Sequence, residues 1–232
     1  MKNILISVIM VLMASLSINA QDGCSKYYPM IEGSSFEYTN YNKKGKIEGI
    51  TNYSVTSVIP QGSATKANLA IKLVDKKGKE LYKSNYSFTC EDDVVKIDYQ
   101  SLFPAQMMGQ YDDMGVDMDI TGTDIEIPNN LEVGQKLADA NITIKMSMSG
   151  INMNISVDQT NREVEKTESV TTTAGTFECY VLNEDTRSKT MGATIELLSK
   201  IWLAEGVGMI KQETYKKNGD LMSKTELSKF SK

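Results

Sequence analysis

The feature that most constrains the fold of this chain is a strict alternation of apolar and polar side chains along much of its length. The alternation is clearest over Asn141–Asp158, where apolar residues stand at every second position on both sides of Ser149-Gly150. Successive side chains of a β-strand point to opposite faces of the sheet. This stretch therefore predicts a β-hairpin with one apolar and one polar face.

The same alternation recurs elsewhere and predicts a series of antiparallel strands. Short turn segments separate the alternating runs, and the Asn-Gly pair in the last of them favours the positive φ angles of a tight hairpin turn. The predicted turns are Lys43-Lys44-Gly45, Lys76-Lys77-Gly78, Asp92-Asp93 and Lys217-Asn218-Gly219. Further strands are predicted over Thr176–Asp185 and Ile195–Trp202.

Two neighbouring segments depart from this pattern. Pro104–Tyr111 predicts one short helix, because proline is favoured in the first helical turn. The acidic stretch 112–127 lacks the Asp-x-Asp-x-Asp-Gly spacing of a calcium loop, which favours a solvated loop over a metal site.

These elements together predict the fold class. About ten strands in one sheet must twist, curl or close. We therefore expect an all-β fold: a single-domain curved antiparallel sheet that forms a barrel or half-open barrel, with one short helix.

The first twenty residues have the pattern of a secretory signal peptide. Lys2 precedes an apolar run from Ile4 to Leu16, and Ile18-Asn19-Ala20 fits a small-residue cleavage site. The run is too short to span a membrane as a helix, and no other stretch approaches that length. We expect residues 1–20 to be a signal peptide and residues 21–232 a single β-rich domain, exported in soluble form to the periplasm or the cell exterior.

Three cysteines follow the predicted signal peptide: Cys24, Cys90 and Cys179. In an oxidising compartment we expect one disulfide and one free thiol, and the sequence does not choose among the three pairings. Lipidation of Cys24 is an alternative, because Gly23 fits the position before a lipidated cysteine. Gln21 replaces the Leu-like residue of that signal, which favours ordinary cleavage before Gln21.

Composition excludes several classes of function. The chain has no histidine, which removes Ser-His-Asp triads, Cys–His pairs and HExxH zinc sites. Its net charge of −5 argues against a nucleic-acid binder. We expect a protein that is not an enzyme, with no catalytic residues, no metal and no cofactor; the enzymatic alternative requires two carboxylates that converge in a cleft.

Two sets of side chains are candidates for ligand binding. Met146, Met148 and Met153 fall on the apolar face of the predicted hairpin, where flexible thioether side chains pack a core or line an adaptable apolar cavity. Copper(I) ligation is the third alternative, disfavoured because no histidine or cysteine stands near them. Trp202, the sole tryptophan, is either an anchor at a cavity mouth or, the favoured alternative, a packed core residue.

Three segments carry a resemblance to a known family: Tyr28–Tyr38, Thr173–Tyr180 with its Ala-Gly-Thr-Phe-x-Cys-Tyr pattern, and Trp202–Tyr215 with Gly-Val-Gly-x-x-Lys-x-Glu. Together they resemble the TapB-type secreted proteins of Bacteroidetes, although Leu203 stands where related sequences have an aromatic residue. The resemblance implies a domain of unknown function with a curved antiparallel sheet, similar in outline to the outer-membrane lipoprotein carriers. It implies no catalytic residues.

The leading hypothesis is an extracytoplasmic protein that binds an apolar ligand, a lipid or acyl chain, within a curved sheet. The alternative is a structural or interaction module of the cell envelope that binds protein or glycan through an exposed face or edge. A cavity inside the sheet favours the first hypothesis, and an exposed apolar patch favours the second.

Overall fold

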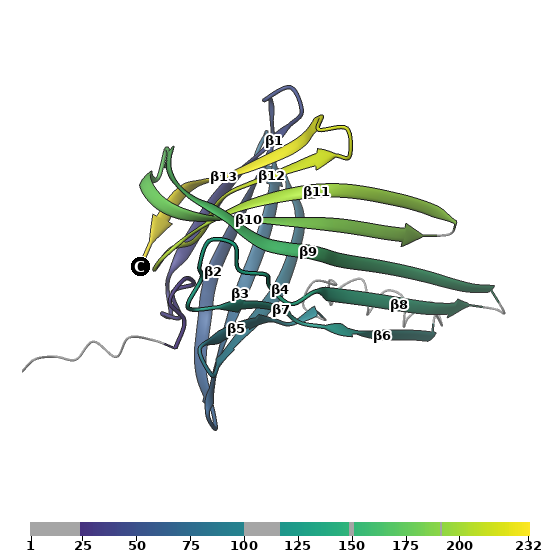
Figure 1. Cartoon of the computed structure of the whole chain (residues 1–232), viewed down its shortest axis with the longest axis horizontal. Coiled ribbons are helices and arrows are strands. Elements are labelled where there is room, and N and C mark those ends of the chain that lie inside the picture. Colours follow the sequence, from purple (N-terminus) through teal and green to yellow (C-terminus); the bar gives the residue numbers. More distant parts are fainter. Residues whose placement is uncertain (1–23, 100–116, 149–150, 191) are drawn as a thin grey trace, which may run out of the picture.

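The computed structural model describes residues 24–99, 117–148, 151–190 and 192–232, and these form a single antiparallel sheet of thirteen strands (Figure 1). The strands are β1 (Ser35–Asn42), β2 (Ile47–Gln61), β3 (Ala64–Asp75), β4 (Glu80–Glu91), β5 (Val94–Ile97), β6 (Asp117–Thr123), β7 (Ile125–Pro128), β8 (Ala140–Met148), β9 (Ile151–Thr172), β10 (Gly175–Thr190), β11 (Ala193–Ala204), β12 (Gly208–Lys216) and β13 (Leu221–Ser231). The predicted all-β class is confirmed.

Each predicted hairpin turn within the described residues is present. Gly45, Gly78 and Gly219 have φ angles of 70°, 83° and 86°, which a residue with a Cβ adopts only at a steric cost. Asp92 and Asp93 also have positive φ angles at the turn between β4 and β5. The hairpin predicted around Ser149-Gly150 pairs β8 with β9 in the expected register, Ile144 opposite Ile155 and Met146 opposite Met153.

Three predicted features lie outside the described residues. They are the short helix Pro104–Tyr111, the signal peptide 1–20 and the turn residues 149–150. None of the described residues lies in an α-helix.

The sheet closes almost completely on itself. Its strand order runs from β6 through β8–β13 and β1–β5 to β7, so β1 pairs with both β2 and the last strand, β13. Only Asp124 separates β6 from β7, although β6 pairs with β8 and β7 pairs with β5. The chain therefore passes directly from one edge of the sheet to the other, which gives the nearly closed barrel that the sequence predicts. In Figure 1, β1–β4 cross β8–β11.

A short loop and one buried arginine seal the seam between β7 and β9. Residues 134–137 pair with β9 through Gly134 N–H to Val164 O and Leu137 N–H to Arg162 O, both 2.8 Å. The Arg162 guanidinium, 4% exposed, donates to the carbonyl oxygens of Ala138 and of Glu126 on β7. Arg162 thus joins β9 to the strand at the opposite end of the sheet order.

The partner of this arginine is Glu184 on β10, which is 7% exposed. Their Nε and Oε2 atoms are 3.6 Å apart. A register shift in the β9–β10 pairing, with Asn161 at a φ of 53°, locally breaks the two-residue alternation beside them. Burial raises the pKa of Glu184 and lowers the pKa of Arg162, although each charge offsets part of the burial cost of the other.

Removal of either partner should destabilise the protein strongly. Arg162→Met leaves the buried Glu184 carboxylate without its counter-charge and two seam carbonyls without their donor, and Glu184→Leu leaves the buried Arg162 charge unpaired. We expect each to cost about 3–5 kcal/mol. The double variant removes the unpaired charge, so its cost should be clearly less than the sum of the single costs. Urea unfolding of all four proteins tests this expectation, and additive costs would contradict the coupling.

The N-terminal segment is fixed to β4 by a disulfide between Cys24 and Cys90, which are 66 residues apart. Cys179 on β10 is free and buried, and burial raises the pKa of its thiol to about 11. The prediction of one disulfide and one free thiol is confirmed. A Cys24 sulfur held in this disulfide has no valence left for a thioether-linked lipid.

Thiol labelling provides a direct test of this arrangement. Native protein should react with no equivalent of iodoacetamide, because Cys179 is buried and its thiol stays protonated near neutral pH. Denatured protein should react with one equivalent, and denatured, reduced protein with three. Three reactive thiols in the denatured, unreduced protein would show that Cys24 and Cys90 are not paired.

Candidate functional site

The interior of the barrel holds a cavity of about 240 Å³ with an aromatic lining. Strands β1–β4 and β12 and the segment before β1 contribute to it. The lining residues are Tyr28, Pro29, Phe36, Tyr38, Tyr53, Leu69, Tyr86, Phe88, Met209 and Gln212. Most of them come from alternate positions of neighbouring strands. Because every second side chain of a strand points to the same face of the sheet, these residues share the inner face.

Tyrosine rings pack edge to face around this cavity. The ring centroids of Tyr38 and Tyr53 are 5.6 Å apart, and those of Tyr53 and Tyr86 are 6.5 Å apart, both close to perpendicular. Tyr28 packs against Phe88 with a centroid separation of 5.6 Å. Such contacts fix the rings without filling the space between them, since edge-to-face pairs keep their centroids well separated.

The cavity is electrically neutral near pH 7. Burial is the main cause that raises the pKa values of Tyr38, Tyr53 and Tyr86, so these phenols remain protonated. The Tyr38 hydroxyl donates a hydrogen bond of 2.9 Å to the carbonyl oxygen of Met209. A lining of neutral rings with a few hydroxyl groups suits an apolar ligand and offers no acid–base pair.

The predicted methionine site lies elsewhere in the sheet. Met146 and Met153 are cross-strand partners in a satellite cluster with Met118, Ile120, Ile142, Ile144 and Ile155. Met148 pairs with Ile151 through the backbone, and its side chain lies outside the described part of the structure. Met146 and Met153 are therefore brought together with each other but do not line the aromatic cavity, and the role of the three methionines in ligand binding stays a prediction.

Trp202 also lies apart from the cavity. Its side chain is 4% exposed, and the Lys211 ammonium lies 3.7 Å from the ring centroid, a cation–π contact between β11 and β12. Its neighbour Leu203 is fully buried in the main core. This packing agrees with the core alternative for Trp202, and the ligand-anchor alternative stays a prediction.

The tyrosines are the cavity residues that the sequence analysis missed. A signal existed in the composition, because the chain has 11 tyrosines and only 5 phenylalanines. Tyr38, Tyr53 and Tyr86 also fall at the alternate positions of their strands that carry the apolar side chains. A buried tyrosine is less common at such positions than an aliphatic side chain.

The described residues form neither a membrane-spanning helix nor a metal centre. No described helix is long and apolar enough to cross a membrane. Within the same residues, no group of three or more His, Cys, Asp or Glu side chains is arranged to hold a metal ion.

Two solved structures share this fold. The first, an inferred exported protein with a YmcC-like fold from Bacteroides fragilis, has a TM-score of 0.71 and 22% identity, over 90% of this chain and 100% of that chain. The second, an inferred lipoprotein from Parabacteroides distasonis, has a TM-score of 0.70 and 24% identity, over 89% of this chain and 99% of that chain. At these identities the likeness shows the fold alone.

Sequence comparison supplies the family. No curated protein matches the chain significantly. The model of the DUF3108-like family matches residues 31–227, which include all thirteen strands except the last residues of β13. The match agrees with the expected curved sheet. It does not show that the chain is one of the TapB-type proteins in particular. The chain belongs to the DUF3108-like family.

Proposed function

We propose that this protein is an exported, non-enzymatic binding protein that takes the apolar part of a small ligand, such as the end of an acyl chain, into its aromatic cavity. The observation that carries the proposal is the cavity of about 240 Å³ lined by tyrosine, phenylalanine, leucine and methionine side chains. Apolar surface that moves from water into such a lining contributes roughly 25 cal/mol per Å².

The size of the cavity limits the ligand. Pockets for drug-sized molecules usually enclose about 300–1,000 Å³, and this cavity is smaller. A whole phospholipid does not fit, whereas the terminal part of one chain does. The rest of the ligand would remain outside the barrel.

Three further lines support the proposal. The similar structures from Bacteroides fragilis and Parabacteroides distasonis are named as an inferred exported protein and an inferred lipoprotein. The resemblance of Tyr28–Tyr38, Thr173–Tyr180 and Trp202–Tyr215 to TapB-type proteins points to a carrier-like sheet. Among the residues that line the cavity, none is a carboxylate, a cysteine or a lysine, so an enzyme is disfavoured there.

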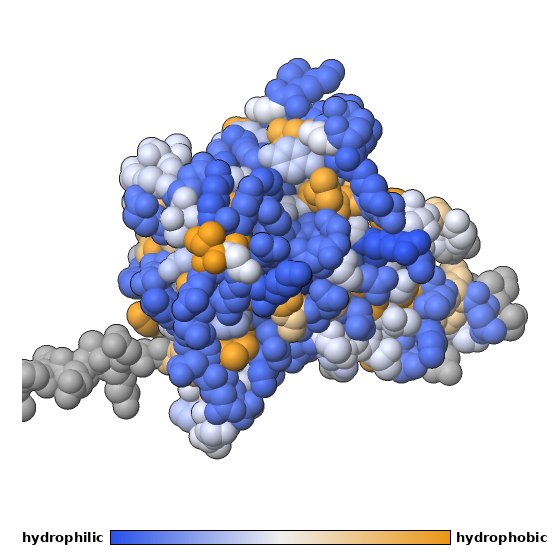
Figure 2. All heavy atoms as spheres, in the orientation of Figure 1, coloured by the Kyte–Doolittle hydropathy of each residue, from blue (hydrophilic) through white to orange (hydrophobic). Residues whose placement is uncertain are grey.

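An envelope module that binds through an exposed apolar patch is less well supported. The large exposed apolar side chains include Ile31, Ile59, Leu81, Val133 and Ile195, which come from separate strands and loops. Figure 2 shows a largely hydrophilic face with isolated apolar spots. Scattered single apolar residues are normal on a soluble surface.

The test is binding of sodium decanoate to the mature protein, measured by calorimetry and by native mass spectrometry. Met209→Trp places a large ring in the cavity, and we expect it to weaken decanoate binding by about tenfold or more, since excluded volume removes the apolar contacts. Met222→Trp is the matched control, because Met222 is 38% exposed on β13. Leu69→Phe is a smaller filling change for use if Met209→Trp does not fold.

Two outcomes would overturn the proposal. The first is the absence of both decanoate binding and any co-purifying apolar mass in protein isolated from its own cells. The second is equal decanoate binding by wild type, folded Met209→Trp and Met222→Trp, which would place the ligand outside the cavity.

A further inference from the structure

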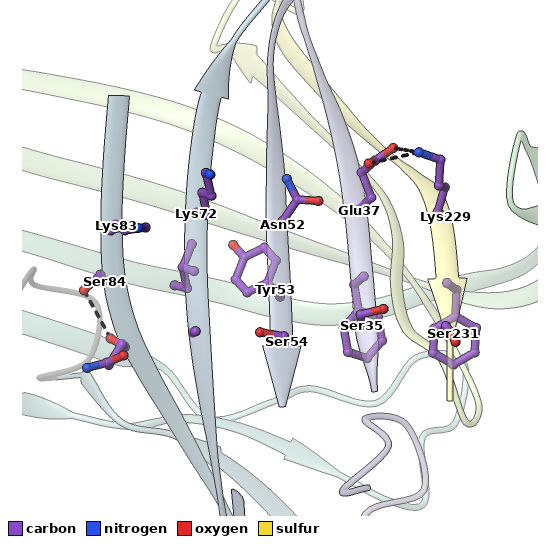
Figure 3. A pocket seen from close by; sticks show the side chains of 15 residues that line it. Ser35, Glu37, Asn52, Tyr53, Ser54, Lys72, Lys83, Ser84, Lys229 and Ser231 are labelled. Atoms are coloured by element: carbon purple, nitrogen blue, oxygen red, sulfur yellow. Dashed lines mark hydrogen bonds and ion pairs between the residues drawn. The ribbon is translucent and has the colours of Figure 1, made fainter. Parts of the chain in front are cut away.

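A second concave feature lies on the solvent side of the strands that enclose the cavity. It is a groove of about 790 Å³ that crosses β13, β1, β2, β3 and β4 (Figure 3). Neighbouring strands are about 4.8 Å apart, so the groove extends for roughly 19 Å across the sheet.

The groove is built from three consecutive residues on each of the five strands, in unbroken register. The middle row includes Phe36 and Tyr53, whose side chains line the interior cavity, so its backbone forms the floor of the groove. One rim is a row of short side chains, and the other is a row of long polar ones. The short rim is Ser231, Ser35, Ser54, Ala70 and Asn85; the long rim is Lys229, Glu37, Asn52, Lys72 and Lys83.

The charged rim has an excess of cations. The ammonium groups of Lys72 and Lys83 both lie 3.4 Å from the same carboxylate oxygen of Glu80, and Lys229 pairs with Glu37 at 3.1 Å. Three lysines therefore share two carboxylates on a protein whose net charge is −5. All three lysine side chains are about half exposed or more, so these pairs are weak and an anionic ligand can compete for them.

The chemistry of the rims separates the classes of ligand. Nine of the ten rim residues are polar, and the remaining one is Ala70, so the rims carry no large apolar side chain that could anchor a lipid or form a protein hot spot. At the groove, β1, β2 and β3 have a strand partner on both sides, so a peptide could add only beside β4 or β13, at the two ends of the groove and not along it. The rims contain no aromatic ring on which a nucleic-acid base could stack.

Hydroxyl and amide groups beside lysines instead match a ligand with many hydroxyl groups and a few acidic groups. Serine and asparagine side chains both donate and accept hydrogen bonds, as sugar hydroxyls do. Lysine ammonium groups donate charge-assisted hydrogen bonds to carboxylates. We propose that this groove binds a linear acidic oligosaccharide, with its hydroxyl groups along the Ser and Asn side chains and its carboxylates at Lys72, Lys83 and Lys229. The proposal does not depend on the apolar ligand of the cavity.

Binding of tetragalacturonate to the mature protein, measured by calorimetry, tests the proposal. Two groove variants separate charge from hydrogen bonding: Lys72→Gln with Lys83→Gln, and Asn52→Leu. The control is Lys43→Gln with Lys76→Gln, which makes the same change in net charge at exposed hairpin turns outside the groove. We expect both groove variants to weaken binding by about fivefold or more and the control to leave it unchanged.

Maltotetraose and inorganic polyphosphate complete the design. Weak binding of neutral maltotetraose that Asn52→Leu removes would support recognition of hydroxyl groups. Absence of tetragalacturonate binding, equal loss in the control pair, or binding of polyphosphate and tetragalacturonate that Asn52→Leu does not alter would overturn the proposal. Decanoate binding should be the same in all groove variants, which separates this result from the test of the cavity.

Discussion

The closure of the sheet depends on a buried charge pair at its seam. Arg162 and Glu184 lose most of their hydration, and their mutual attraction, the hydrogen bonds from Arg162 to backbone carbonyls and the hydrogen bond from Gln159 to Glu184 offset that cost. An apolar residue at position 162 could pack there but could not satisfy the carbonyl oxygens of Glu126 and Ala138. Arg162, held in place by Glu184, therefore links β9 to β7, the last strand in the sheet order.

A wall one sheet thick separates the two concave features. The backbone of Phe36 and Tyr53 forms part of the groove floor, while their side chains line the cavity. Each strand of this wall therefore presents mainly apolar side chains to the inside and mainly polar side chains to the outside. Alternation of residue type along β1, β2 and β3 is enough to give the two faces different ligand chemistry.

Much of the fold was predictable because strand formation is encoded locally. The alternation over Asn141–Asp158 and the glycines at positions 45, 78 and 219 predicted hairpins that the structure contains. Closure of the sheet was harder to predict from the sequence, because it depends on residues far apart in the chain. The bulge at Asn161 and the contact of Arg162 with Glu126 are examples. Cys24 and Cys90 are brought together in the same way, so the sequence left their pairing open. The cavity was missed because convergence of Tyr38, Tyr53 and Tyr86 is a property of sheet curvature, which the period of two does not specify.

The position of β1 between β2 and β13 has a consequence for the order of folding. β1 is the first of the described strands in sequence, and one of its two neighbours, β13, is the last of them. Hydrogen bonds between Ser35–Asn42 and residues 223–231 require the two ends of the chain to meet, so loop-closure entropy opposes the step and slows it. A chain that is still emerging can form the hairpins of β2–β5 but cannot complete the barrel. The nascent protein therefore remains incompletely folded until β13 has been synthesised.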